Sequence, residues 1–255
     1  MKKFMSKWLR WVIALLLLVV ALVCAGIWIE HQPAMSPVKQ FSKQLTTTGD
    51  NNSLNKSQRD KIAQAVMKDD QKGANLNKQG FVAMPNLSIL MPVYDNAYSL
   101  AALDLGANTA NKGTPVPTMG EGNYTLAAHN WDNGYTGFSA MQQHINQDAP
   151  YLVDGKMGGS DWLNGKQIYL ANAKGIYTYT VKNQTTVDQN DVSVLDVDAR
   201  LNNKAKLTII TCLFPNTDYR IITNAEYTDF DSWQSAPSKL VSQFDTSKHK
   251  TNITP

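Results

Sequence analysis

The hydrophobic positions of this 255-residue chain form one long block followed by many short ones. The long block runs from Trp11 to Ile29 without a charged residue, and a helix of about 19 apolar residues is long enough to cross a bilayer. A cleaved signal peptide is the alternative, but its apolar region usually spans only ~7–15 residues and ends at small residues. This block ends in Ile27-Trp28-Ile29-Glu30, so we expect an uncleaved transmembrane helix at 11–29.

Positive charge flanks only one side of this block. Four basic residues precede it and no acidic residue occurs before Glu30; the four are Lys2, Lys3, Lys7 and Arg10. The positive-inside rule then places residues 1–10 in the cytoplasm and the rest of the chain outside the cell membrane. The whole chain has 24 basic and 21 acidic residues, so the part after the block is close to neutral. A nucleic-acid-binding surface is therefore not expected.

A polar segment, residues 30–80, follows the block. It is rich in Ser, Thr, Asn, Gln, Lys and Gly, which is typical of a solvated extracellular stalk. Within it, residues 57–67 place Ile62, Ala63, Val66 and Met67 on one side of a helix. The spacing predicts a helix, but it does not decide whether that helix packs on the domain or stands alone.

From residue 81 onward the chain shows short apolar runs separated by turn residues, which is typical of β-strands. Strands are predicted at 81–85, 87–94, 123–128, 167–170, 176–181, 207–212 and 219–223, short helices at 96–105 and 139–145, a loop at 106–120 and a polar connection at 188–206. Short strands with few helices favour a closed or nearly closed β-barrel, because closure removes exposed strand edges. We expect this domain at 81–227 and a C-terminal tail at 228–255.

The two cysteines lie in different parts of the chain. Cys24 falls inside the long apolar block. Cys212 ends the predicted strand 207–212 and has no disulfide partner in the exported part. Two interpretations are open for Cys212: an inert buried thiol, because free cysteine is among the most buried residue types, or a reactive thiol.

Three residues capable of chemistry occupy predicted strand ends: His129, Cys212 and Arg220. A thiolate is the nucleophilic form of cysteine, and a neighbouring histidine can accept its proton and return one to a leaving group. An arginine is always charged and can stabilise the oxyanion that forms when a peptide carbonyl is attacked. Each residue alone fits a structural role better, as His31, His144 and His249 do, but the combination favours catalysis.

At these residues the chain resembles the sortase family. The segment Thr125-Leu126-Ala127-Ala128-His129-Asn130 is similar to the signature Thr-Leu-x-Gly-His-Asn, Leu207-Thr208-Ile209-Ile210-Thr211-Cys212 is similar to Leu-x-Thr-Cys, and Arg220 follows at a spacing that the family uses. The resemblance covers about residues 80–227. It implies an all-β-dominated fold, an eight-stranded β-barrel with short helices, attached here to the N-terminal transmembrane helix.

The resemblance also implies a function, that of a class A-like cysteine transpeptidase on the outer side of the cell membrane. Cys212 would attack the Thr carbonyl of a Leu-Pro-x-Thr-Gly sorting signal on a surface protein, with His129 moving protons and Arg220 stabilising charge. The amine of a cell-wall precursor, a lipid II-like molecule, would resolve the thioacyl intermediate. An apolar groove for the Leu-Pro part is implied at Ala127, Val192, Val194, Leu195, Thr208 and Ile210, with ordinary barrel core as the alternative for each.

The chain departs from the family pattern in three places. Ala128 stands where glycine is usual, and residues 147–164 form an extra segment. Relatives that bind calcium use several carboxylates, whereas Glu121 is the only acid just before the histidine strand and Val197 occupies the later region. We therefore expect neither a metal nor another cofactor. Two alternatives stay open, a pilin-polymerising sortase and a non-catalytic, membrane-tethered peptide-binding module.

Overall fold

The computed structural model describes residues 53–68, 75–111 and 113–255. The predicted transmembrane helix at 11–29 and much of the predicted stalk lie outside these residues. Within the three described ranges, no helix is both long enough and apolar enough to span a bilayer. Leu54–Pro255 folds as one compact unit.

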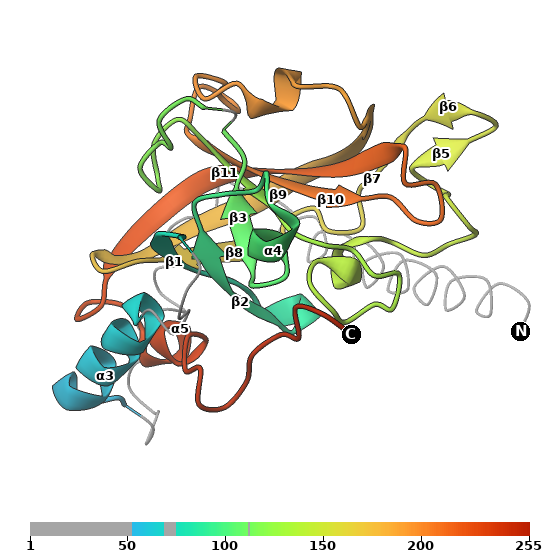
Figure 1. Ribbon diagram of the computed structural model, residues 1–255. Coiled ribbons are helices and arrows are strands. Elements are labelled where there is room, and N and C mark those ends of the chain that lie inside the picture. Colours follow the sequence, from blue (N-terminus) through green and yellow to red (C-terminus); the bar gives the residue numbers. More distant parts are fainter. Residues whose placement is uncertain (1–52, 69–74, 112) are drawn as a thin grey trace, which may run out of the picture. The chain divides into compact units, whose positions relative to one another are not determined.

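In this unit, eight strands close into a barrel in the order β11-β10-β4-β3-β2-β1-β8-β9, because β9 and β11 also pair with each other (Figure 1). The strands are β1 (Lys78–Met84), β2 (Ile89–Tyr94), β3 (Ala107–Thr109), β4 (Asn123–Ala127), β8 (Gln167–Ala171), β9 (Gly175–Asp188), β10 (Lys206–Cys212) and β11 (Tyr219–Ser232). The predicted eight-stranded barrel with few short helices is thereby confirmed. Closure leaves no free edge around the ring.

The structure differs from the sequence-based prediction in the lengths of several strands. The segment 106–120, predicted as a loop, contains β3, whose three residues are too few to show alternation but pair with both β2 and β4. β9 and β11 are also longer than predicted. The extension of β9 carries buried polar residues such as Gln184, whose Nε2 donates to Oγ1 of Thr223 in β11 at 2.8 Å. A hydrophobic pattern does not register such positions.

The remaining short elements lie outside the ring. The extra segment 147–164 forms a hairpin of β5 (Leu152–Val153) and β6 (Lys156–Met157), followed by β7 (Gly159–Ser160) on the edge of β9. The two predicted helices are present but shorter than expected, as α4 (Leu100–Leu103) and the 3-10 turn η2 (Ser139–Met141). Two further 3-10 turns are η1 (Pro85–Leu87) and η3 (Ser193–Leu195).

The barrel interior is filled by alternate side chains of the strands. Tyr124 and Leu126 of β4 and Leu207 and Ile209 of β10 belong to this core, together with Ala128 just beyond β4. Since successive strand residues point to opposite faces, the intervening residues of β4 and β10 face outward. This alternation decides which side chains face outward from the barrel.

A second apolar cluster covers the outside of β1 and answers the question about the helix at 57–67. That helix is α3 (Lys56–Met67), which begins at a capping box formed by Asn55 and Gln58 and packs beside α5 (Ser238–Ser242) (Figure 1). The Arg59 guanidinium donates to the main-chain oxygens of Trp233 at 3.0 Å and Ala236 at 2.6 Å. The helix is therefore part of the folded domain.

The C-terminal segment runs along the barrel to the loop that follows His129. Thr251 exchanges two hydrogen bonds with the main chain of Leu90 in β2, at 2.9 and 2.8 Å. The carbonyl of Asn252 accepts from Gly137 N–H at 2.8 Å, and that of Ile253 accepts from Trp131 Nε1 at 2.9 Å. Residues expected only as a tail thus support a loop at the candidate site.

Candidate active site

The topology brings the three predicted catalytic residues to one end of neighbouring strands. β4 and β10 run parallel, with Ala127 opposite Ile210, so both strands finish at the same end of the barrel. His129 lies two residues beyond β4, and Cys212 is the last residue of β10. β11 returns antiparallel, with Arg220 directly opposite Cys212. Residues that are distant in sequence therefore meet at one barrel rim.

Cys212 is a partly exposed free thiol. Leu207 and Ile209 point into the core, so the alternation along β10 turns the Cys212 side chain outward. The residue is therefore not sealed in the interior, as an inert structural cysteine would be. It is the one free cysteine in the described part of the chain.

His129 contacts two side chains that the sequence did not reveal. Its Nε2 lies 3.1 Å from Oδ1 of Asp104, the residue that follows α4. Its ring packs on the indole of Trp131, with a centroid separation of 4.8 Å. The side chain of His129 is 19% exposed and that of Asp104 is 47% exposed. The imidazole is thus held between a carboxylate and an aromatic ring while one edge stays open to solvent.

The Arg220 guanidinium is held at the rim by its own hairpin. Nη1 donates to the carbonyls of Thr217 at 2.6 Å and Tyr219 at 3.0 Å, and Nη2 lies 3.3 Å from Oε1 of Gln189. A guanidinium has five N–H donors. Three of the five have partners within the described ranges, which leaves donors for a carbonyl oxygen or an oxyanion.

The predicted groove residues occupy two layers. Ala127 and Ile210 lie side by side and are half-buried, while Val192, Val194 and Leu195 lie at or beside η3 in the connection between β9 and β10 and are exposed or half-buried. Thr208 is fully buried instead. Its hydroxyl donates to Oδ1 of Asn123 at 2.7 Å, so Thr208 lies beneath the outer layer.

Asn123 links Thr208 to the connection above it. Its Nδ2 donates to the carbonyls of Val194 at 3.1 Å and Asp196 at 2.9 Å, and its main-chain N–H donates to Val197 O at 2.9 Å. Asn123 itself is fully buried. The buried amide of Asn123 therefore holds η3 in position against the sheet.

The far end of the same connection is held by a buried carboxylate. Glu226 accepts hydrogen bonds from Asn202 Nδ2 at 2.6 Å and Lys204 Nζ at 2.8 Å. Burial alone would raise the pKa of Glu226, but these hydrogen bonds and the charges of Lys204 and Lys182 outweigh it and hold the pKa below its ordinary value. Polar contacts therefore anchor the connection in its middle and at the end that leads into β10.

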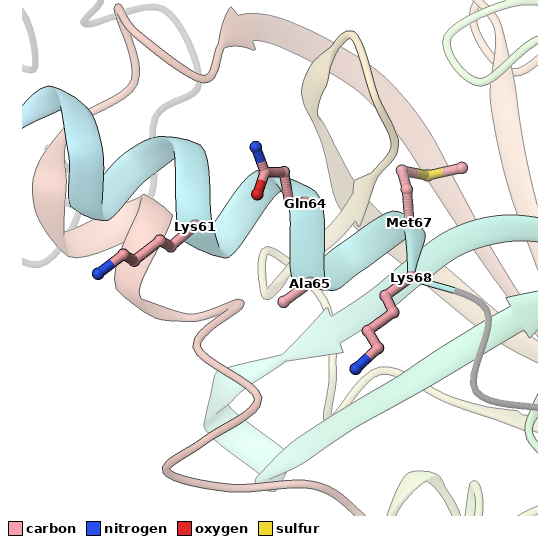
Figure 2. Close-up of a pocket in the computed structure, with 5 residues that line it drawn as sticks. All are labelled: Lys61, Gln64, Ala65, Met67 and Lys68. Carbon is pink, nitrogen blue, oxygen red and sulfur yellow. The ribbon is translucent and has the colours of Figure 1, made fainter.

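No competing site of comparable chemistry occurs in the described part of the chain. A hollow beside α3 is lined by Lys61, Gln64, Ala65, Met67 and Lys68, all on α3 or its C-cap (Figure 2). Groups from a single helix surface do not converge on a ligand. Among the described residues, no group of three His, Cys, Asp or Glu side chains is placed to hold a metal ion.

Comparison with known proteins places this rim in context. A family model described as the sortase domain matches residues 82–228. Over 256 residues the chain is 25% identical to sortase A of Streptococcus agalactiae serotype III, covering 96% of this chain and 94% of that protein. It is 31% identical over 143 residues to sortase A of Listeria monocytogenes, covering 54% of this chain and 52% of that protein. The crystal structure of the Listeria sortase A aligns with a TM-score of 0.46 at 26% identity, covering 60% of this chain and 88% of that one.

Proposed function

The chain belongs to the sortase family of transpeptidases, and from this premise we propose that it is a membrane-anchored enzyme which attaches surface proteins to the cell wall. It cleaves Leu-Pro-x-Thr-Gly-type sorting signals between Thr and Gly and transfers the Thr carbonyl to the amine of a cell-wall precursor. The observation that carries the proposal is Cys212, a partly exposed thiol that ends β10 opposite Arg220. The proposed anchor is the apolar segment 11–29.

The reaction uses the rim residues in two half-steps. The Cys212 thiolate attacks the Thr carbonyl carbon, a C–S bond forms, and the oxyanion is stabilised by the Arg220 guanidinium. Collapse breaks the C–N bond to Gly, and His129 gives its proton to the departing amine. The acceptor amine then attacks the thioacyl carbon and loses its proton to His129, and the Cys212 thiolate leaves.

The Leu-Pro part of the signal is proposed to lie over the outer face of β4 and β10. Ala127 and Ile210 supply the apolar floor next to Cys212. Val192, Val194 and Leu195 supply the wall from above. Thr208 contributes from beneath, through its bond to Asn123.

The test is transfer of a Leu-Pro-x-Thr-Gly peptide to an amine by the purified full chain, followed by mass spectrometry. Addition of hydroxylamine should release a peptide hydroxamate at Thr, because hydroxylamine attacks a thioacyl carbon as the acceptor amine does. Peptide binding without transfer or hydroxamate would favour the non-catalytic binding module. Formation of peptide polymers through a lysine of a pilin-type acceptor, with no use of a cell-wall-type amine, would favour the pilin-polymerising sortase.

Asp104 should tune the reaction rather than carry it. Asp104→Asn should lower kcat/KM by about two- to fivefold, because an ion pair with a half-exposed carboxylate contributes ~1 kcal/mol or less. The deficit should shrink when about 0.5 M salt screens the pair. Asp132→Asn is the matched control, since Asp132 is 46% exposed and lies 3.9 Å from His144. A loss above about 100-fold would instead make Asp104 part of the chemistry.

Asn123 should affect peptide binding. Asn123→Ala removes the amide that holds η3, so we expect KM for the peptide to rise about tenfold, equivalent to ~1.4 kcal/mol, with kcat within about threefold. Steady-state kinetics measure the split between KM and kcat. The control is Thr125→Val, because Thr125 is also buried, pairs with Thr208 and donates to Ala110 O without touching the connection. An unchanged KM would separate the connection from the binding groove.

A further inference from the structure

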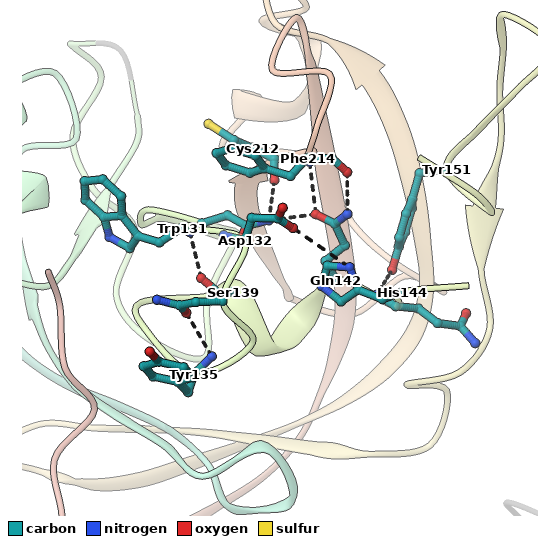
Figure 3. A network of polar contacts seen from close by, with 12 residues as sticks. Trp131, Asp132, Tyr135, Ser139, Gln142, His144, Tyr151, Cys212 and Phe214 are labelled. Atoms are coloured by element: carbon teal, nitrogen blue, oxygen red, sulfur yellow. Dashed lines mark hydrogen bonds and ion pairs between the residues drawn. The ribbon is translucent and has the colours of Figure 1, made fainter. Parts of the chain in front are cut away.

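The main chain just after Cys212 is held by a side chain that belongs to neither sequence signature. At Phe214, Gln142 takes the place of a strand partner: its Nε2 donates to Phe214 O at 2.6 Å, and its Oε1 accepts from Phe214 N–H at 3.0 Å (Figure 3). The two bonds use both ends of one amide, so they fix its orientation. Gln142 is 2% exposed, and it follows η2, 72 residues earlier in the chain.

Asn130, the residue next to His129, joins the same network. The two protons of its Nδ2 go to Gln142 Oε1 at 2.7 Å and to Cys212 O at 2.9 Å, and its Oδ1 accepts from Asp132 N–H at 2.9 Å. Asn130 is 4% exposed. Both protons and the oxygen of this amide therefore have hydrogen-bond partners, and one of these bonds links the segment of His129 directly to Cys212.

A further hydrogen bond joins the two segments on the N-terminal side of Cys212 and His129. The Thr211 hydroxyl donates to Ala128 O at 3.0 Å, so the residues preceding Cys212 and His129 are also tied together. His129 and Cys212 are thus flanked on both sides by bonds between their segments. Figure 3 shows the Cys212 sulfur on the opposite side of its backbone from Gln142, so the network holds the main chain and leaves the thiol free.

We infer that Gln142 and Asn130 are positioning residues. Their buried amides hold the Cys212 sulfur and the His129 imidazole in a fixed position relative to each other. This inference rests on the proposed function, because proton transfer between the sulfur and the imidazole is what requires their fixed relative position. Reacting groups must be held within about 0.5 Å of the productive geometry by locked neighbours. Buried hydrogen bonds supply such locking, since leaving a buried amide or carbonyl unpaired costs about 1–3 kcal/mol.

A purely structural role would leave the thiol chemistry unchanged, so the test reads that chemistry directly. The background is the full chain with Cys24→Ala, in which Cys212 is the remaining cysteine. The rate of Cys212 alkylation by iodoacetamide is measured against pH, because only the thiolate reacts and a nearby histidine changes the thiolate fraction. The His129→Ala variant defines the profile of a thiol without its partner.

In Gln142→Met, kcat for peptide transfer should fall by about 10- to 100-fold with KM within about twofold, since a misplacement of ~1 Å costs up to about 10²-fold. The alkylation profile should move toward that of His129→Ala by at least about 0.3 pH unit. Gln142→Asn keeps an uncharged amide but is one methylene shorter, so it cannot hold both Phe214 and Asn130 as Gln142 does. It should show a smaller change in the same direction, and it replaces Gln142→Met if that variant does not fold.

The control is Arg59→Met, which also removes hydrogen bonds to main-chain carbonyls of a distant segment but acts at α3. It should lower Tm and leave both kcat and the alkylation profile at wild-type values. In the His129→Ala background, Gln142→Met should produce no further shift of the alkylation profile, because the imidazole that Gln142 helps to position is absent.

Two results would overturn the inference. One is a wild-type alkylation profile in Gln142→Met and Gln142→Asn, whatever their Tm; the other is a His129→Ala profile identical to that of the wild type. Failure of the wild type to transfer any peptide would count against the proposed function instead. The alkylation profiles would still decide the positioning role, because they need no substrate peptide.

Discussion

Replacing Cys212 with alanine should abolish peptide transfer, by on the order of 10⁴-fold or more, because a covalent mechanism loses its nucleophile. Peptide affinity should change little, since the alanine keeps the Cβ and the surrounding rim. The measurements are product formation by mass spectrometry, hydroxamate formation with hydroxylamine, and peptide binding by calorimetry. We expect the first two to vanish and the third to persist within about twofold.

The chain offers its own control for this experiment. Cys24→Ala removes the other cysteine and should leave the transfer rate at the wild-type value, because Cys24 lies in the predicted membrane segment. Unchanged turnover in Cys212→Ala would exclude Cys212 as the nucleophile. A parallel loss in Cys24→Ala would point to a general thiol effect rather than to catalysis by one residue.

The barrel was predictable because the short strands carry their own signals. The β-branched and apolar residues of 207–212 mark β10, and turn residues separate most strands. β3 was missed because three residues contain no period. The full lengths of β9 and β11 were missed because buried polar residues such as Gln184 are satisfied by each other in three dimensions, which a hydrophobic pattern does not encode.

The candidate catalytic residues could be proposed from sequence because each occupies a strand end, and strand ends are fixed by the same patterns. Their supporting residues could not. Asp104 is 25 positions from His129, and Gln142 is 72 positions from Phe214. The pairing of β3 with β4 brings Asp104 close to His129, and the parallel pairing of β4 with β10 brings the segment after His129 close to Phe214. Neither pairing leaves a local trace in sequence.

One predicted groove residue, Thr208, is placed differently in the structure from what its motif indicates. Thr208 lies in a signature strand and faces outward, yet the connection from β9 to β10 buries it completely. The sequence indicates that Thr208 lies on the outer face of its strand, but it does not indicate that another segment covers this residue. Asn123, which links Thr208 to η3, was predicted only as the start of a strand.

Arg220→Ala should reduce the rate of thioacyl formation by about 10²- to 10³-fold, because loss of one preorganised oxyanion donor typically costs this much in kcat. Arg220→Lys should recover only part of the rate. A lysine supplies the charge as a single point, whereas the guanidinium uses Nη1 to hold the carbonyls of Thr217 and Tyr219 while it keeps further donors for the substrate. Single-turnover acylation, measured at saturating peptide, reports this step directly.

Arg200→Ala is the matched control. Arg200 Nη1 also donates to nearby main-chain carbonyls, those of Asp198 at 2.8 Å and Ala199 at 3.2 Å, but it lies in the connection before β10, not opposite Cys212. Its loss should leave acylation within about twofold of the wild type. If Arg220→Ala raised KM and left the acylation rate at saturation unchanged, Arg220 would bind the peptide in its ground state instead of stabilising the developing charge. Equal rates for Arg220→Lys and the wild type would show that charge alone suffices and that the forked geometry of the guanidinium contributes nothing to the step.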